Sequence, residues 1–96
     1  MTLEVGIAIF LRSLVDGSLY TGQTKNLKDR LSRHNRGMIR STKAKAPFEL
    51  GYFEVVGTRA EAMWREWELK KQWNTLRKKR AIAEFDTTKI KEILGL

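Results

Sequence analysis

The apolar run from Leu3 to Leu11 (LEVGIAIFL) constrains the fold more than any other segment. It is rich in Ile, Val and Phe and too short for a stable helix, so it predicts a strand that is buried on both faces. The run is far shorter than the roughly 20 apolar residues that cross a bilayer. It also lacks the charged flank and the small-residue cleavage site of a signal peptide. We therefore expect a strand within a soluble, cytoplasmic domain that does not contact a membrane.

A hairpin signal, Asp16-Gly17, follows this run. In a two-residue hairpin turn both central residues need positive φ, which Gly and Asp tolerate. Residues 18–22 (SLYTG) are then expected to return as a second, antiparallel strand.

A short helix and a third strand are predicted next. Asn26 can cap a helix over Leu27–Asn35, which Gly37 ends by accepting a left-handed conformation. A basic, polar connection leads to Pro47, after which Phe48–Val56 (FELGYFEVV) reads as the third strand.

The remainder of the chain is predicted to be helical. Thr58 and Glu61 form a capping-box pattern, which predicts a helix from Ala60 to about Trp73. Residues 74–85 and a final segment from Asp86 through Leu94 are expected to be two further helices. We therefore expect an α+β fold, in which helices flank a small, three-stranded antiparallel sheet. The 96 residues allow a single domain over 1–96, with a core at about 3–80 and a C-terminal helical extension at 81–96.

Positive charge is concentrated in two blocks. Residues 25–45 contain eight basic and one acidic residue, and residues 70–80 contain six basic and no acidic residue, in a chain of formal net charge +8. Such a surface attracts nucleic acid or another polyanion; the alternative is that the charge only keeps a small domain soluble. The expected nucleic-acid contacts are Lys25, Lys28, Arg33, Arg36, Arg40, Lys43 and Lys45, with Arg77, Lys78, Lys79 and Arg80 as a second patch. Trp64, Trp67 and Trp73 are candidates to stack on bases or to pack in the core.

Four side chains are candidates for catalysis. The absence of Cys and the single His exclude a thiol nucleophile, a zinc-thiolate site and a histidine cluster. Glu66 shares a helix face with Ala62 and Leu69, a face that should be buried. The carboxylate could be a metal ligand or a catalytic acid. Alternatively, it forms an inward salt bridge or lies at the rim with its charge in water. Arg30 and His34 lie four residues apart on one helix. Arg30 could bind phosphate and His34 could transfer a proton; the alternative is a pair of surface residues. Tyr20 precedes Gly22, which would let a backbone or a ligand approach closely. Together these groups could cleave a phosphodiester.

At these residues the chain resembles the GIY-YIG nuclease family, and in particular its small, single-domain bacterial members. The likeness covers roughly residues 5–80 and is carried by 11–22 (LRSLVDGSLYTG), 26–34 (NLKDRLSRH), 46–54 (APFELGYFE) and 61–71 (EAMWREWELKK). The resemblance implies Mg²⁺- or Mn²⁺-dependent hydrolysis of duplex or branched DNA by an endonuclease, with structure specificity and a role in DNA repair or recombination. It also implies a general base or water positioner at Tyr20, a phosphate ligand at Arg30, a proton-transfer group at His34 and the metal ligand at Glu66.

The first motif departs from the family pattern, which places a Tyr in the first strand. Read forward from Gly6, that position is Ala8; read backward from Arg12, it is Ile9. Neither residue has a hydroxyl group. One alternative is therefore a catalytically weakened nucleic-acid-binding module of the same fold. Another is a protein whose acidic partner is a second protein; the oligomeric state stays open.

Overall fold

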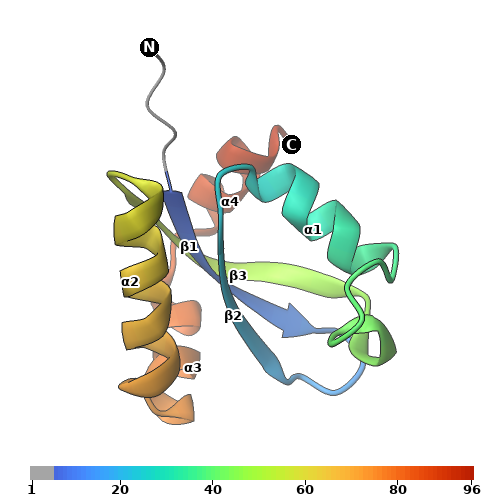
Figure 1. The fold of residues 1–96 in the computed structure, drawn as a ribbon. Coiled ribbons are helices and arrows are strands. Elements are labelled where there is room, and N and C mark those ends of the chain that lie inside the picture. Colours follow the sequence, from blue (N-terminus) through green and yellow to red (C-terminus); the bar gives the residue numbers. More distant parts are fainter. Residues whose placement is uncertain (1–5) are drawn as a thin grey trace.

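The computed structural model describes residues 6–96, which form a three-stranded antiparallel sheet with helices on both of its faces (Figure 1). The strands are β1 (Gly6–Ser13), β2 (Leu19–Thr24) and β3 (Phe48–Val56), in the spatial order β2-β1-β3. The predicted fold class is confirmed. The predicted beginning of the first strand, Leu3 to Val5, lies outside the described residues.

The helices follow the capping residues. They are α1 (Leu27–Asn35), a 3-10 turn η1 (Lys43–Lys45), α2 (Arg59–Lys71), α3 (Thr75–Glu84) and α4 (Thr87–Leu94). The four α-helices begin after Asn26, Thr58, Asn74 and Asp86, whose side chains each accept a hydrogen bond from a backbone N–H of the first turn. Within residues 6–96, every helix is too short or too polar to span a bilayer.

The central strand β1 is buried on both faces, as its composition predicts. On one face Ile7, Ile9 and Leu11 pack with Leu27 of α1 and with residues of α4. On the other face Ala8 and Phe10 pack with Leu69 of α2 and with residues of α3. Figure 1 shows the corresponding layers, with α1 and α4 on one side of the sheet and α2 and α3 on the other.

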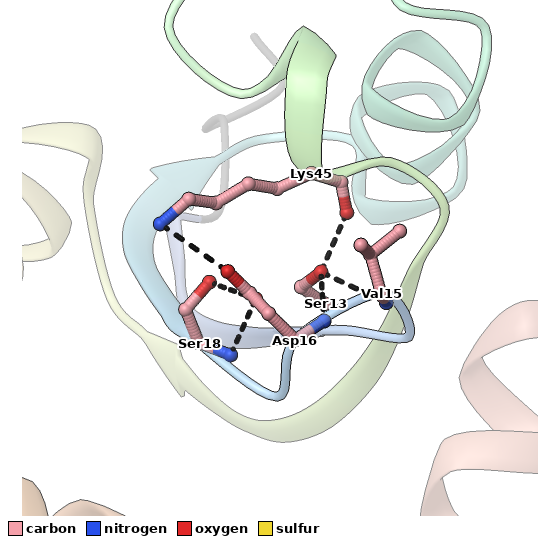
Figure 2. A network of polar contacts seen from close by, with 5 residues as sticks. All are labelled: Ser13, Val15, Asp16, Ser18 and Lys45. Carbon is pink, nitrogen blue, oxygen red and sulfur yellow. Dashed lines mark hydrogen bonds and ion pairs between the residues drawn. The ribbon is translucent and has the colours of Figure 1, made fainter.

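The connection between β1 and β2 differs from the predicted two-residue turn. Five residues, 14–18, join the strands, and Gly17 adopts φ +75° whereas Asp16 does not have positive φ. The Asp16 carboxylate instead accepts hydrogen bonds from the Ser18 hydroxyl at 2.7 Å and the Ser18 N–H at 2.9 Å. These bonds close the loop through a side chain (Figure 2). They also lower the pKa of Asp16 to about 2.

Close contact between β1 and α2 depends on Gly6. A Cβ atom at Gly6 would lie 2.3 Å from the Cβ of Ala62 and 2.6 Å from the carbonyl oxygen of Thr58. Only glycine therefore permits the first turns of α2 to approach the strand this closely. This contact sets the distance of α2, and of Glu66 within it, from the sheet.

Candidate active site

Tyr20 lies on the edge strand β2, opposite Leu11 of β1, and is half-buried. A Cβ atom at Gly22 would lie 2.7 Å from Cε1 of the Tyr20 ring. The group that approaches this glycine is therefore the ring of Tyr20 itself, from the same strand. The missing side chain at Gly22 allows the phenol to lie along β2.

Helix α1 directs Arg30 and His34 toward this phenol. The two residues are one turn apart, so they share a face of the helix. Arg30 Nη2 donates a hydrogen bond to the Tyr20 hydroxyl oxygen at 3.0 Å. The His34 ring lies 4.7 Å from the Tyr20 ring, measured between centroids. The structure therefore brings together three of the four predicted catalytic side chains in direct contact.

His34 is fully buried and neutral at pH 7. Burial, aided by the positive charge of Arg30, lowers its pKa to about 4. Nδ1 lies 2.8 Å from the hydroxyl oxygen of Thr42, which also contacts the carbonyl oxygen of Ile39 at 3.4 Å. Nε2 is buried without a hydrogen-bond partner among residues 6–96.

Glu66 reaches the site from α2. Ala62 and Leu69, one turn before and one turn after it, are fully buried, whereas Glu66 itself is half-buried. Among the described residues its carboxylate forms no hydrogen bond and no salt bridge. It therefore occupies the rim of the buried face and keeps its charge available to a ligand.

Glu66 and Arg30 line the same open cavity of about 310 Å³ beside the edge strand β2. The other residues of the wall are Gln23, Thr24, Lys25, Asn26, Asp29, Arg33 and Arg59. Tyr20 and His34 are not part of this wall, and Tyr20 is joined to it through Arg30. The cavity thus combines four cationic side chains with two carboxylates, which suits a phosphate together with a bound cation.

Arg59 and Asp29 are cavity residues that the sequence analysis missed. Arg59 precedes Glu66 by seven residues, or about two helical turns, and this spacing is a signal that could have identified it. Asp29 is held by Arg33 at 3.2 Å, one turn along α1. In the sequence, an acidic residue in the first turn of a helix indicates only a helix-stabilising role.

The residues fit a hard divalent cation that keeps most of its water. Carboxylate oxygen is the ligand that Mg²⁺ and Mn²⁺ prefer, and Glu66 has an unpaired carboxylate facing the cavity. Within residues 6–96 there is no cluster of three or more His, Cys, Asp or Glu side chains that could enclose a metal ion. An ion at Glu66 would therefore depend on water and on phosphate oxygens for its other ligands.

The basic residues predicted to bind nucleic acid divide into two regions. Lys25 and Arg33 line the cavity, and Lys28, Arg36, Arg40, Lys43 and Lys45 are exposed on α1 and on the connection to β3. Of these, Lys45 forms an ion pair with Asp16 at 3.6 Å (Figure 2).

The second basic region lies on α3, and two of its side chains contact other residues of the protein. The Lys78 ammonium group donates to Thr21 Oγ1 at 3.2 Å, and burial lowers its pKa. The Arg77 guanidinium lies over the Trp73 ring at 4.0 Å. Lys79 and Arg80 are exposed. Because Thr21 belongs to β2, Lys78 lies beside the same edge strand that borders the cavity.

Comparison with known proteins agrees with this architecture. Residues 9–81 match the family model of the GIY-YIG catalytic domain. UPF0213 proteins of Staphylococcus aureus strain Mu3 and of Staphylococcus saprophyticus are each 41% identical to the chain over 63 residues, which cover 65% of this chain and 77% of theirs. The solution NMR structure of a UPF0213 protein from Bacillus halodurans is similar with a TM-score of 0.50 and 28% identity, covering 82% of this chain and 83% of that one.

Proposed function

Because the chain belongs to the GIY-YIG nuclease family, we propose that it is a divalent-metal-dependent endonuclease that hydrolyses phosphodiester bonds in DNA. One observation carries this proposal: Arg30 holds the Tyr20 hydroxyl and at the same time lines a cavity with the unpaired carboxylate of Glu66. A cation for phosphate, a hydroxyl for water and a carboxylate for a metal ion are thereby joined at one place on the surface.

Arg30 and Tyr20 act on the phosphate and on the attacking water. The Tyr20 oxygen accepts the hydrogen bond from Arg30, so its own hydrogen is available to a water molecule or to a phosphate oxygen. The remaining Nη N–H groups of Arg30 are suited to two oxygens of one phosphate, whereas its Nε is buried. Positive charge fixed in this way stabilises the negative charge that develops on the phosphate in the transition state.

His34 orients Tyr20 by packing its ring against the phenol. Its pKa of about 4 means that a proton held on the ring at pH 7 costs about 4 kcal/mol, so we do not assign it the storage of a proton. A neutral ring packed against the phenol fixes the direction of the Tyr20 hydroxyl without adding charge.

Glu66 is the residue that would hold Mg²⁺ or Mn²⁺. When bound, such an ion supplies positive charge that favours ionisation of water and stabilises phosphate oxygens. Exposed Lys and Arg side chains on α1 and on the connection that follows it hold the flanking DNA backbone, without reading its sequence. Branched DNA arises in repair and recombination, and we propose that the enzyme acts on such structures in the cytoplasm.

A DNA-binding module without catalysis is the second candidate. Ile9 lies on the same face of the sheet as Tyr20, opposite Gly22, and is fully buried, whereas Ala8 lies on the other face beside Leu69. The position where a second tyrosine could share the site is therefore Ile9, and it supplies no hydroxyl. Loss of one preorganised donor costs roughly 10²–10³ in rate.

Cleavage assays distinguish these candidates. Branched and blunt duplex DNA are incubated with Mg²⁺ or Mn²⁺ and with the wild-type protein, Glu66→Ala or Glu66→Gln. We expect cleavage by the wild type alone and binding by all three proteins. Equal cleavage by wild type and Glu66→Ala would assign the activity to a contaminant, and binding without cleavage by the wild type would support the module.

A further inference from the structure

Two tryptophan side chains lie on the outer surface of α2. Trp64 is 64% exposed and Trp67 is 46% exposed. Their rings are stacked on each other, with centroids 5.3 Å apart and an angle of 17° between planes. Trp73 instead packs against Phe10 at 6.0 Å, so only this third tryptophan contributes to the core. Aromatic side chains normally bury roughly 150–250 Å² each, so an exposed and stacked pair marks a candidate interaction site.

The two sides of this pair carry different charges. Lys70 and Lys71 follow Trp67 by three and four residues, so they lie on the same helix face, and both are exposed. Beside Trp64, a cavity of about 430 Å³ is lined by Glu61, Arg65 and Glu68 among others. Arg65 is bound by Glu54 and lies near Glu68, so the hollow has carboxylates without a free cation.

We propose that Trp64 and Trp67 form a stacking platform for unpaired nucleobases, so that the substrate is DNA with a single-stranded segment next to the cleaved bond. This inference rests on the proposed function. Every nucleobase has a planar face that can extend a stack of parallel aromatic rings, and such stacking is independent of sequence. A phosphate backbone is attracted by Lys70 and Lys71 and repelled by the carboxylates near Trp64. Those carboxylates can accept hydrogen bonds from the amino groups of bases.

The platform and the candidate active site share helix α2. Glu66 directly precedes Trp67 in α2, and Met63, which is 55% exposed, separates the rings from Arg59 in the cavity wall. A strand held by the platform therefore has a short path along one helix to the cavity. A fully paired duplex offers free base faces only at its ends, so the platform favours substrates with unpaired nucleotides.

Binding measurements with the Glu66→Ala protein test this proposal without cleavage. The probes are a short oligothymidylate, a duplex with a single-stranded tail, and the same duplex with blunt ends. We expect oligothymidylate to quench tryptophan fluorescence. We expect Trp64→Ala and Trp67→Ala each to weaken binding of the oligothymidylate and the tailed duplex about tenfold, with blunt duplex unaffected. The corresponding Phe variants retain most of the affinity. Leu76→Ala, which removes an equally exposed apolar side chain (65%) on α3, is the matched control and changes nothing.

Three results would overturn the platform. The first is an unchanged affinity for the tailed duplex in both Ala variants. The second is an equal loss of affinity for tailed and blunt DNA. The third is that the wild-type protein sediments as a dimer and the Ala variants sediment as monomers. The last result would identify a second copy of the chain as the partner. If cleavage requires Glu66 but is unchanged in both tryptophan variants, the proposed nuclease activity is supported and the platform is wrong. If the wild-type protein binds DNA through the two tryptophans but never cleaves it, the platform is supported and the proposed nuclease activity is wrong.

Discussion

Arg30 Nη2 donates a hydrogen bond to the Tyr20 hydroxyl oxygen at 3.0 Å, and this bond joins the first helix to the edge strand. Arg30 also lines the cavity that contains Glu66. A single guanidinium therefore binds the phenol and lines the cavity that Glu66 also lines, although Tyr20 itself is not part of the cavity wall. Its planar, forked geometry allows one side chain to hold the phenol and still present N–H groups to a ligand in the cavity.

Arg30→Lys should lower the cleavage rate about 10²-fold, because an ammonium group cannot hold the Tyr20 oxygen and two phosphate oxygens together. Single-turnover cleavage with saturating protein measures the change. Arg33→Lys is the matched control, since Arg33 lines the same cavity but pairs with Asp29. An unchanged rate in Arg30→Lys would contradict a role in holding the phosphate.

His34 should make the protein less stable as the pH falls from 6.5 toward 4. His34 binds a proton near pH 6.5 in the unfolded chain but only near pH 4 in the folded protein. The contribution of neutral His34 to the free energy of unfolding is therefore fully present above pH 6.5 and is lost as the pH falls toward 4. The loss is roughly 3 kcal/mol over this range. Urea unfolding measures it, and His34→Gln should flatten the dependence. Because His34 is the sole histidine, its NMR resonances give a direct check; a midpoint near 6.5 would refute the burial argument.

Ile9→Tyr should raise the cleavage rate about 10-fold or more, because it adds a hydroxyl on the sheet face of Tyr20. The larger side chain enters a fully buried position and should cost about 1–3 kcal/mol of stability. Ile9→Phe carries a similar steric cost without the hydroxyl and should not gain activity. If both variants cleave at the wild-type rate, the missing hydroxyl does not limit the reaction.

Ser13→Ala should destabilise the protein by about 1–3 kcal/mol. Ser13 is buried; its hydroxyl donates to the Lys45 carbonyl oxygen at 2.6 Å and accepts from the Val15 N–H at 3.1 Å (Figure 2). Its loss leaves these groups without a partner and loosens the segment that carries Thr42. Ser18→Ala, at the less buried end of the same loop, should cost less in urea unfolding. Equal costs would show that the buried hydroxyl has no special role.

Affinity for blunt duplex DNA should fall steeply as the salt concentration rises. If the protein contacts roughly six or more phosphates, the affinity should fall about 10³-fold or more between ~50 and ~200 mM salt. Fluorescence anisotropy at several salt concentrations measures the slope. Replacing exposed Arg36 and Arg40 by Gln should reduce that slope, whereas replacing the half-buried Lys78 should reduce it less. A flat salt dependence would contradict binding through phosphate contacts.

Local sequence predicted most of the secondary structure. The bounds of α1 and β3 follow from Asn26, Gly37 and Pro47, because capping and φ restriction act over a few residues. The β1–β2 loop was predicted incorrectly at Asp16, since a side-chain hydrogen bond within the loop replaced the positive φ that the turn pattern requires.

The sequence by itself determined the fold class, the family and the four candidate side chains, because these depend on periodicity, short-range capping and motif spacing. Only the tertiary structure decided which groups meet: Arg59 beside Glu66, the ring of Tyr20 over Gly22, and the burial that keeps His34 neutral. It also put Ile9 on the sheet face that carries Tyr20 and Ala8 on the opposite face. The physical reason is that burial and contact across the sheet depend on how the helices pack on its two faces, and spacing along the chain does not specify that packing.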